Sequence, residues 1–298
     1  IIIYTIWDKP DLVITTHLNF IPVAHLLKRL YGIRYYTIAH GIEAWNLQKP
    51  SLIKALKECD RILSVSHYTR DRLIKEQNLN PEKIFVLPNT FNHEKFKITP
   101  KPNYLLERHQ LSTETKIILT VARLSSSEQY KGFDQVIQSL PKIITQILNV
   151  HYIIVGKGDD RARIEQLIKD LNLENYVTLA GFIPDEELCD YYNLCDVFAM
   201  PSKGEGFGIV YLEAMACGKP CLGGNQDAAL DALCHGELGA LVNPDDIEEI
   251  ANTLITILQG NYPNPLMYQP EKLREKVIEI YGFEKFKATL ANYLEEII

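Results

Sequence analysis

Residues 197–222 read VFAMPSKGEGFGIVYLEAMACGKPCL and have the pattern of a strand, a loop, a helix and a second strand. An apolar run ends at Met200, and three glycines follow within five positions before an apolar helical pattern begins at Ile209. Gly218 and Pro220 are residue types that end helices, and another short apolar run follows them. This stretch therefore predicts a β-α-β unit of a parallel sheet.

The same alternation of short β-branched runs and longer amphipathic stretches covers most of the chain, which favours an α/β fold. At 298 residues the chain exceeds the roughly 100–200 residues of a typical domain. Residues 98–111 carry two prolines and no clear period, and a new series of strands begins at Ile117. We therefore expect two doubly wound parallel-sheet domains that face a cleft, at residues 1–104 and 105–280, followed by a terminal helix at residues 281–298.

Composition and charge exclude several classes of protein. A net charge of −7 gives no general attraction to nucleic acid. The six cysteines form no CxxC pair, which indicates buried, reduced thiols of a cytoplasmic protein. Residues 1–7 are apolar but too short for a membrane span and lack the basic flank of a signal peptide. They look like the interior of a domain, so the N-terminal domain is expected to be truncated.

Two cations follow the first strand of the second half. Arg123 stands at the end of the apolar run, and Lys131 precedes Gly132, which opens a helical pattern. In open parallel sheets ligands bind beyond the carboxyl ends of the strands. A diphosphate needs fixed cations and N–H donors. Either residue alone is more often a solvated surface charge, but the shared strand-end position favours an anion site.

Two carboxylates flank the start of the helix in the opening segment. Glu205 precedes its N-terminus, and Glu213 lies about one and a half turns inside it. A carboxylate on such a helix can accept hydrogen bonds from both hydroxyls of a ribose. The alternative is an ordinary surface charge, which the apolar neighbours of Glu213 disfavour. We expect the two carboxylates on opposite sides of one pocket, with the helix N-terminus facing the phosphates.

Arg123, Lys131, Glu205 and Glu213, with the glycines around them, resemble the donor-site signature of retaining glycosyltransferases of family four, which have the GT-B fold. The spacing Glu205-x7-Glu213 is the most specific element. The resemblance implies that Arg123 and Lys131 hold the nucleotide diphosphate, that Glu213 takes the ribose hydroxyls and that Glu205 contacts the transferred sugar. It also makes residues 1–104 the acceptor side and residues 105–280 the nucleotide-sugar-binding domain, and it makes the terminal helix cross back to the first domain.

Other segments extend the resemblance. Gly156 lies in a match to the family's strand-end glycine turn, and Ile183 lies in a match to its base-binding loop, beside the uracil. Four loop residues are also assigned to donor binding, namely Gly206, Phe207, Gly208 and Ile209. His40, followed by a glycine at a strand end, matches the family's catalytic-site histidine, and His17 is a weaker candidate that faces the acceptor. Residues 223–227 lack the family's glutamate, which leaves the donor sugar open.

The resemblance implies a retaining hexosyltransferase that uses UDP-hexose, with glucose or a related hexose as the first choice and GDP-hexose as the alternative. The acceptor would be a hydroxyl of a glycan or a lipid-linked saccharide. No Asp-x-Asp occurs, so we expect no metal and no further cofactor. Such an enzyme would be cytoplasmic, with a peripheral contact to the inner face of the membrane left open. Two alternatives stay open: a nucleotide-sugar epimerase on the same fold, and a non-catalytic partner that binds sugar nucleotides.

Overall fold

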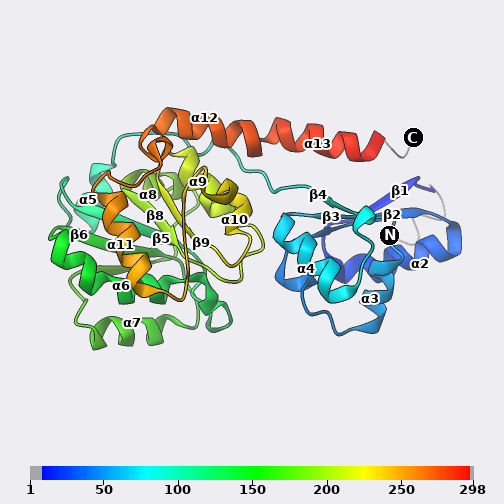
Figure 1. The fold of residues 1–298 in the computed structure, drawn as a ribbon, viewed down its shortest axis with the longest axis horizontal. Helices are drawn as coiled ribbons and strands as arrows, with labels where there is room; N and C mark the ends of the chain where they lie inside the picture. The colour runs from blue at the N-terminus through cyan, green and yellow to red at the C-terminus, as the bar shows by residue number, and fades with distance from the viewer. Residues whose placement is uncertain (1–8, 296–298) are drawn as a thin grey trace. The chain divides into compact units, whose positions relative to one another are not determined.

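The computed structural model describes residues 9–295, and the chain divides into two compact units. One unit holds the residues up to Asn89 together with the C-terminal end from Thr289, and the other holds Thr90–Ala288. Each unit is an α/β structure around one parallel sheet (Figure 1). The expected fold class, two α/β units with parallel sheets, is thereby confirmed. The expectations about residues 1–7 fall outside the described residues.

In residues 9–89, the sheet of the N-terminal unit has four parallel strands in chain order. These are β1 (Leu12–Thr15), β2 (Arg34–Ala39), β3 (Arg61–Ser64) and β4 (Ile84–Val86). They are connected through α2 (Ile21–Tyr31), α3 (Pro50–Lys57) and α4 (His67–Gln77). The sequence patterns do not predict α3, although its proline in the first turn is a known start signal. Because the strand order follows the chain, the described part of this sheet is wound in one direction, and the double winding expected of the first domain is not found there.

The sheet of the C-terminal unit has six parallel strands in the order β10-β9-β8-β5-β6-β7. Their bounds are β5 (Lys116–Val121), β6 (Val150–Val155), β7 (Val177–Gly181), β8 (Val197–Met200), β9 (Cys221–Gly224) and β10 (Ala240–Val242). The chain starts in the middle at β5, moves outward to β7, and returns to the other side of β5 at β8. The sheet is doubly wound, as predicted, and its direction reverses between β5 and β8. Ligands of such sheets bind at this reversal point.

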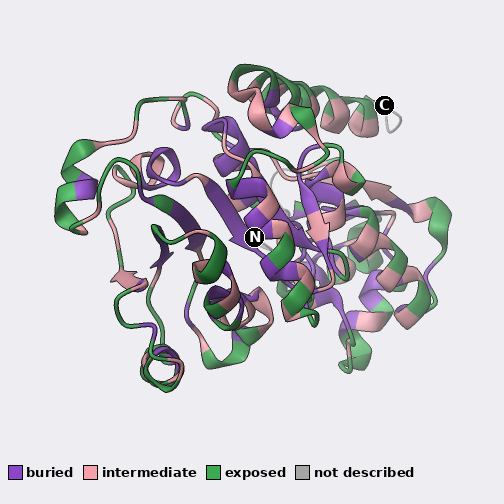
Figure 2. Cartoon of the chain, turned by 60° about the vertical axis from the view of Figure 1, so that its left-hand side comes forward, coloured by how far each residue is buried: buried purple, intermediate pink, exposed green. Residues whose placement is uncertain are grey.

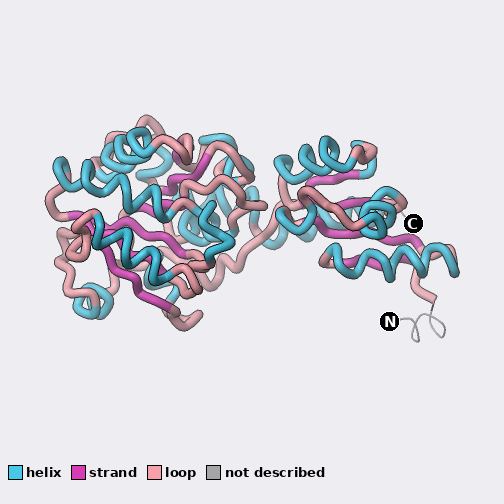
Figure 3. Tube along the Cα trace, turned by 90° about the horizontal axis from the view of Figure 1, so that it is seen from below, coloured by secondary structure: helices cyan, strands magenta, loops and turns pink. Residues whose placement is uncertain are grey.

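Helices cover this sheet on either side, as Figure 3 shows. One group is α6 (Phe133–Gln146) with α7 (Arg161–Asp170) and α11 (Ile247–Leu258), which contact one another through α6. The other is α8 (Leu188–Leu194), α9 (Ile209–Ala216) and α12 (Pro270–Tyr281), which contact one another through α9. The short α10 (Ala229–Ala232) follows β9. Most strands between the two helix layers are buried, as the purple arrows in Figure 2 show, whereas the edge strand β7 is mostly of intermediate burial.

The prediction of a linker at residues 98–111 is wrong. The structure places helix α5 (Asn103–Arg108) there, with Leu105 and Leu106 buried, and α5 contacts α8. The sequence did not predict this helix, because two prolines precede it and six residues are too few to show helical periodicity. The segment is therefore folded onto the C-terminal unit.

The last helix, α13 (Phe283–Glu295), ends on the sheet of the N-terminal unit. The Tyr293 hydroxyl donates to the Val86 carbonyl at 2.9 Å, and Arg61 donates to the Tyr293 carbonyl at 2.9 Å. The Tyr293 ring also lies 5.1 Å from the ring of Phe85, centroid to centroid. The far end of the chain is thus held by β3 and β4. Among the described residues, no helix has the length and apolar character of a membrane span.

Candidate functional site

A pocket of about 460 Å³ opens at the carboxyl ends of the strands around the reversal point of the C-terminal sheet. The loops after β5, β6 and β7 and the first residues of α8 and α9 form its wall. The lining residues are Val121, Ala122, Arg123, Lys131, Val155, Gly156, Lys157, Phe182, Ile183, Pro184, Asp185, Leu188 and Val210. Its volume lies within the roughly 300–1,000 Å³ of small-molecule sites. Of the residues chosen from the sequence, Arg123, Lys131, Gly156 and Ile183 meet here.

Two cations and two carboxylates alternate beside this pocket. Arg123 Nη2 lies 2.5 Å from Glu128 Oε1, and Lys131 Nζ lies 2.9 Å from Glu205 Oε2. Lys131 Nζ is also 3.7 Å from Glu128 Oε2. The side chain of Arg123 is 79% exposed, whereas that of Lys131 is only 13% exposed. Since the formal charges cancel, an incoming anion has to compete with the two carboxylates for the cations.

Glu128 is a residue that the sequence analysis missed. It is buried between Arg123 and Lys131, and its Oε2 accepts no hydrogen bond from the described residues. An unsatisfied buried carboxylate oxygen is costly, so the two neighbouring cations must hold it there electrostatically. Its backbone is non-helical, with φ −120° and ψ 27°, so no helical spacing in the sequence points to its pairing with Lys131.

Two glycines bring the pocket loops together. A Cβ on Gly156, whose φ is +143°, would lie 1.8 Å from the Ala122 carbonyl oxygen. A Cβ on Gly132, with φ +84°, would lie 2.3 Å from the Pro201 carbonyl oxygen. Both positions therefore exclude any side chain. In both cases the close neighbour is main chain of an adjacent strand-end loop, so these glycines shape the pocket by letting its walls touch.

Asp227 fixes the glycine-rich loop that follows β8. Its Oδ2 accepts hydrogen bonds from the Ser202 hydroxyl and from the Glu205 N–H, both at 2.7 Å. Its Oδ1 accepts from the Ala229 N–H at 2.9 Å. The side chain is fully buried, and this burial raises the pKa of the carboxyl although the three donors oppose the shift. Asp227 therefore holds the backbone of Glu205, and the sequence analysis gave it no role.

Replacing Asp227 with alanine should lower the free energy of unfolding by about 3 kcal/mol, because buried donors left without acceptors cost about 1–3 kcal/mol each. Urea denaturation followed by circular dichroism measures this change. Asp245→Ala is the matched control: Asp245 pairs with Lys203 at 2.5 Å on the exposed surface, where such pairs contribute about 0–1 kcal/mol. Equal losses for the two variants would contradict the anchoring role.

The other four loop residues chosen from the sequence differ in their burial. Gly206, Phe207 and Gly208 are buried, and the Phe207 ring packs edge-on against Tyr281 with centroids 5.5 Å apart. Ile209 is 38% exposed. Phe207 therefore anchors the loop in the core.

Helix α9 begins at this loop with Gly208 as its N-cap, in the left-handed region and without a capping side chain. Val210 in its first turn lines the pocket, so the positive end of the helix dipole lies at the pocket wall. Further along, the Tyr192 hydroxyl of α8 donates to Glu213 Oε2 at 2.7 Å. Burial raises the pKa of Glu213 above its usual range, and the Tyr192 bond opposes this. Neither Glu213 nor Glu205 is among the residues that line the pocket, so the expectation of two carboxylates on opposite sides of it is not met.

The two histidines chosen from the sequence belong to the N-terminal unit. His40 is exposed, and its Nε2 lies 2.9 Å from the Thr16 carbonyl oxygen, which can only accept. The Nε2 atom of His40 therefore carries a proton. The His40 main-chain N–H donates to Glu43 Oε1 at 2.6 Å. His17 accepts the Asn19 N–H at its Nδ1, 3.1 Å away, and so caps a short 3-10 helix, which is a structural role.

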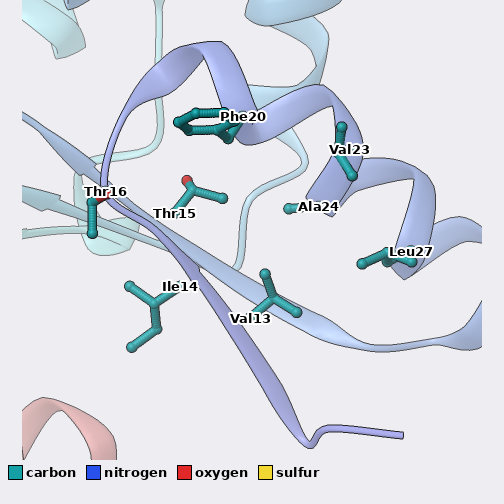
Figure 4. A pocket seen from close by; sticks show the side chains of 8 residues that line it. All are labelled: Val13, Ile14, Thr15, Thr16, Phe20, Val23, Ala24 and Leu27. Atoms are coloured by element: carbon teal, nitrogen blue, oxygen red, sulfur yellow. The ribbon is translucent and has the colours of Figure 1, made fainter. Parts of the chain in front are cut away.

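A second hollow, of about 200 Å³, lies in the N-terminal unit between β1 and α2. Figure 4 shows the eight side chains around it. They are Val13, Ile14, Thr15, Thr16, Phe20, Val23, Ala24 and Leu27. Most are apolar, and none is an ionisable group. This hollow therefore offers no charged group to a ligand.

Comparison with known proteins matches each unit to a family of glycosyltransferases. Residues 105–280 match the family described as "Glycosyl transferases group 1", and residues 3–95 match "Glycosyltransferase Family 4". N-acetyl-alpha-D-glucosaminyl L-malate synthase of Bacillus anthracis is 28% identical over 88% of this chain and 68% of its own length. A GDP-mannose-dependent phosphatidylinositol monomannoside mannosyltransferase of Mycolicibacterium smegmatis is 27% identical over 78% and 63%. The chain thus spans about two thirds of the length of these relatives.

Solved structures agree on the fold. Anabaena HepE, crystallised in complex with UDP, superposes with a TM-score of 0.85 at 20% identity, over 99% of this chain and 81% of HepE. Sucrose-phosphate synthase from Thermosynechococcus elongatus superposes with a TM-score of 0.81 at 22% identity, over 99% and 75%. These similarities establish the two-domain architecture, and the identities are too low to carry substrate from one chain to another.

Proposed function

The chain belongs to the glycosyl transferases group 1 family, and from that membership we propose that it is a retaining hexosyltransferase. It moves a hexose from UDP-hexose to a hydroxyl of a glycan or a lipid-linked saccharide. The observation that carries this proposal is the cluster of Arg123, Glu128, Lys131 and Glu205 at the pocket beside the start of α9. A lipid-linked acceptor would bring the protein into peripheral contact with a membrane.

A diphosphate fits the cluster by exchange of partners. Lys131 and Arg123 are both held by carboxylates, and a diphosphate brings about two negative charges to the N-terminus of α9. When the phosphates take Lys131, Glu205 loses its 2.9 Å partner and becomes free to accept hydrogen bonds from sugar hydroxyls. Glu128 stays buried behind both cations and keeps them in place. The same cluster thus serves the phosphates and the sugar.

The largest contribution to catalysis is expected from stabilising the negative charge of the leaving diphosphate. Charge grows on the diphosphate as the bond to the sugar breaks, and Arg123, Lys131 and the first amides of α9 oppose that charge. Glu205 is proposed to orient the sugar and not to attack it, because a same-face route needs no carboxylate nucleophile. Retention then follows a same-face route in which the leaving phosphate takes the proton of the acceptor. His40 is proposed to contact the sugar, on the family resemblance.

The nucleoside is held further from the charges. Ile183 and Phe182 offer apolar surface to a base, and the Lys157 ammonium lies 4.8 Å from the centre of the Phe182 ring, which fixes the rim of the pocket. Glu213 is proposed to accept the ribose hydroxyls. Its carboxylate has about four acceptor sites, so the single bond from Tyr192 leaves capacity for two more donors.

A thermal-shift panel of UDP, GDP and ADP with their hexose forms tests the donor. We expect the largest rise in melting temperature with UDP and UDP-hexose, because a ligand at 100 times its Kd stabilises the native state by about 2.7 kcal/mol. A larger shift with GDP would overturn the choice of uridine; one curated relative is itself GDP-mannose-dependent. Incubation with donor alone provides the control: a changed sugar released without acceptor would identify an epimerase instead.

A further inference from the structure

Two cysteines face each other across helices α8 and α9. Cys189 Sγ lies 3.9 Å from Cys217 Sγ, at the C-cap of α9, and both thiols are free. Cys217 is 1% exposed, whereas Cys189 is partly open to solvent, which corrects the expectation that it is buried. A disulfide bond has a sulfur–sulfur length of about 2.0 Å. An approach of about 1.9 Å would therefore join the two helices.

The surroundings of Cys189 favour its thiolate. Asn193 Nδ2 lies 3.4 Å from the Cys189 sulfur and can donate to it. The Cys217 thiol, which stays protonated in its buried position, is the second donor and contributes most to lowering the pKa of Cys189 to about 6. The hydrogen bond with Cys189, followed by burial, raises the pKa of Cys217. The exposed member is thus the nucleophile, and the buried member holds the proton.

We propose that Cys189 and Cys217 are a redox-active thiol pair that closes to a disulfide across α8 and α9. The reagent class is a low-molecular-weight disulfide such as glutathione disulfide. The Cys189 thiolate attacks one sulfur of the reagent and forms a mixed disulfide with it. The other half of the reagent leaves as a glutathione thiolate. The Cys217 sulfur then attacks the Cys189 sulfur, and the thiol proton passes to the departing glutathione thiolate, so that the second glutathione leaves as a thiol. The two protein thiols lose two electrons, and the reagent gains them.

The pair lies one helical turn from the proposed ribose site. Tyr192 follows Cys189 by three residues on α8, and Glu213 precedes Cys217 by four residues on α9. The thiol pair and the 2.7 Å bond from Tyr192 to Glu213 are therefore neighbouring links of the same helix contact. Leu188, next to Cys189, also lines the pocket. Shortening one link shifts the other, so closure of the disulfide changes nucleotide affinity. This last step rests on the proposed function.

The test uses the full chain in glutathione buffers of increasing glutathione disulfide content. We expect the loss of two hydrogens in the intact mass and a tryptic cross-link between the Cys189 and Cys217 peptides. Cys189→Ala and Cys217→Ala should both abolish the cross-link. Cys234→Ala is the matched control, because Cys234 is also partly exposed but contacts the Tyr281 hydroxyl at 3.2 Å and no second thiol. It should leave the cross-link unchanged.

UDP titration of the reduced and oxidised forms should differ in Kd by at least about fivefold, the lower end of typical coupling between sites. A stable mixed disulfide on Cys189 with the Cys217 thiol still reduced would overturn the pair. A disulfide that leaves the Kd unchanged would overturn its coupling to the ribose site. A disulfide in a protein whose reduced form binds no nucleotide would refute the proposed function and leave the thiol pair standing.

Discussion

Lys131→Ala is expected to lower kcat at saturating donor by about 100- to 1,000-fold, the loss that follows removal of one preorganised donor from a site of developing charge. Lys131 is the less exposed of the two pocket cations, at 13%, so water replaces it poorly. Its ammonium is also the group that exchanges Glu205 for the diphosphate in our proposal. Initial rates of UDP release at several donor concentrations separate kcat from KM.

Lys142→Ala provides the control for this measurement. Lys142 lies on α6, is 31% exposed and pairs with Glu248 away from the pocket lining, so its loss should leave kcat unchanged. Lys131→Ala with unchanged kcat at saturating donor would show that the assignment of the leaving-group contact is wrong. A rise in KM alone would mean that Lys131 binds ground state and transition state equally.

The strands and the reversal point could be predicted because they depend on local pattern. The segment 197–200 is a strand as expected, and the helix that follows the glycine-rich loop begins at Ile209 as expected. Parallel pairing then brings the strand-end loops to one edge of the sheet, which is why Arg123 and Lys131 meet in one pocket. Helix α5 was not predicted because six residues carry too little periodicity. Helix α3 was also missed, although the predicted α9 has the same length of eight residues.

The supporting residues of the site could not be predicted, because their partners are distant in sequence. Asp227 binds Ser202 across 25 positions, and nothing in the local pattern of either residue reveals the pair. The glycines illustrate a second limit. The sequence shows that Gly156 leaves space, but the structure is needed to show that the Ala122 carbonyl fills it. A glycine in the sequence indicates a position where the backbone can approach another group closely, and only the fold identifies that group.

Glu213→Gln should weaken UDP binding by roughly 100-fold. A hydrogen bond to a charged group contributes about 1.5–3 kcal/mol, and the amide replaces an acceptor oxygen by a donor nitrogen that cannot accept from a ribose hydroxyl. Calorimetric titration of UDP measures the loss. Dideoxy-UDP, which lacks both ribose hydroxyls, completes a double-mutant cycle. It should bind the unaltered protein more weakly than UDP does, and the variant, which keeps one acceptor oxygen, should discriminate less between the two ligands than the unaltered protein.

The same carboxylate predicts a pH dependence. Burial raises the pKa of Glu213, so the group protonates at a higher pH than an ordinary glutamate. Only the ionised form accepts from both hydroxyls; UDP affinity should therefore fall as the pH is lowered through this raised pKa and be restored above it. The protonation of UDP itself is common to both proteins, so it cancels in a comparison with Glu213→Gln. If that variant kept the pH profile of the unaltered protein, a different group would be responsible, and Glu213 would not be the ribose ligand.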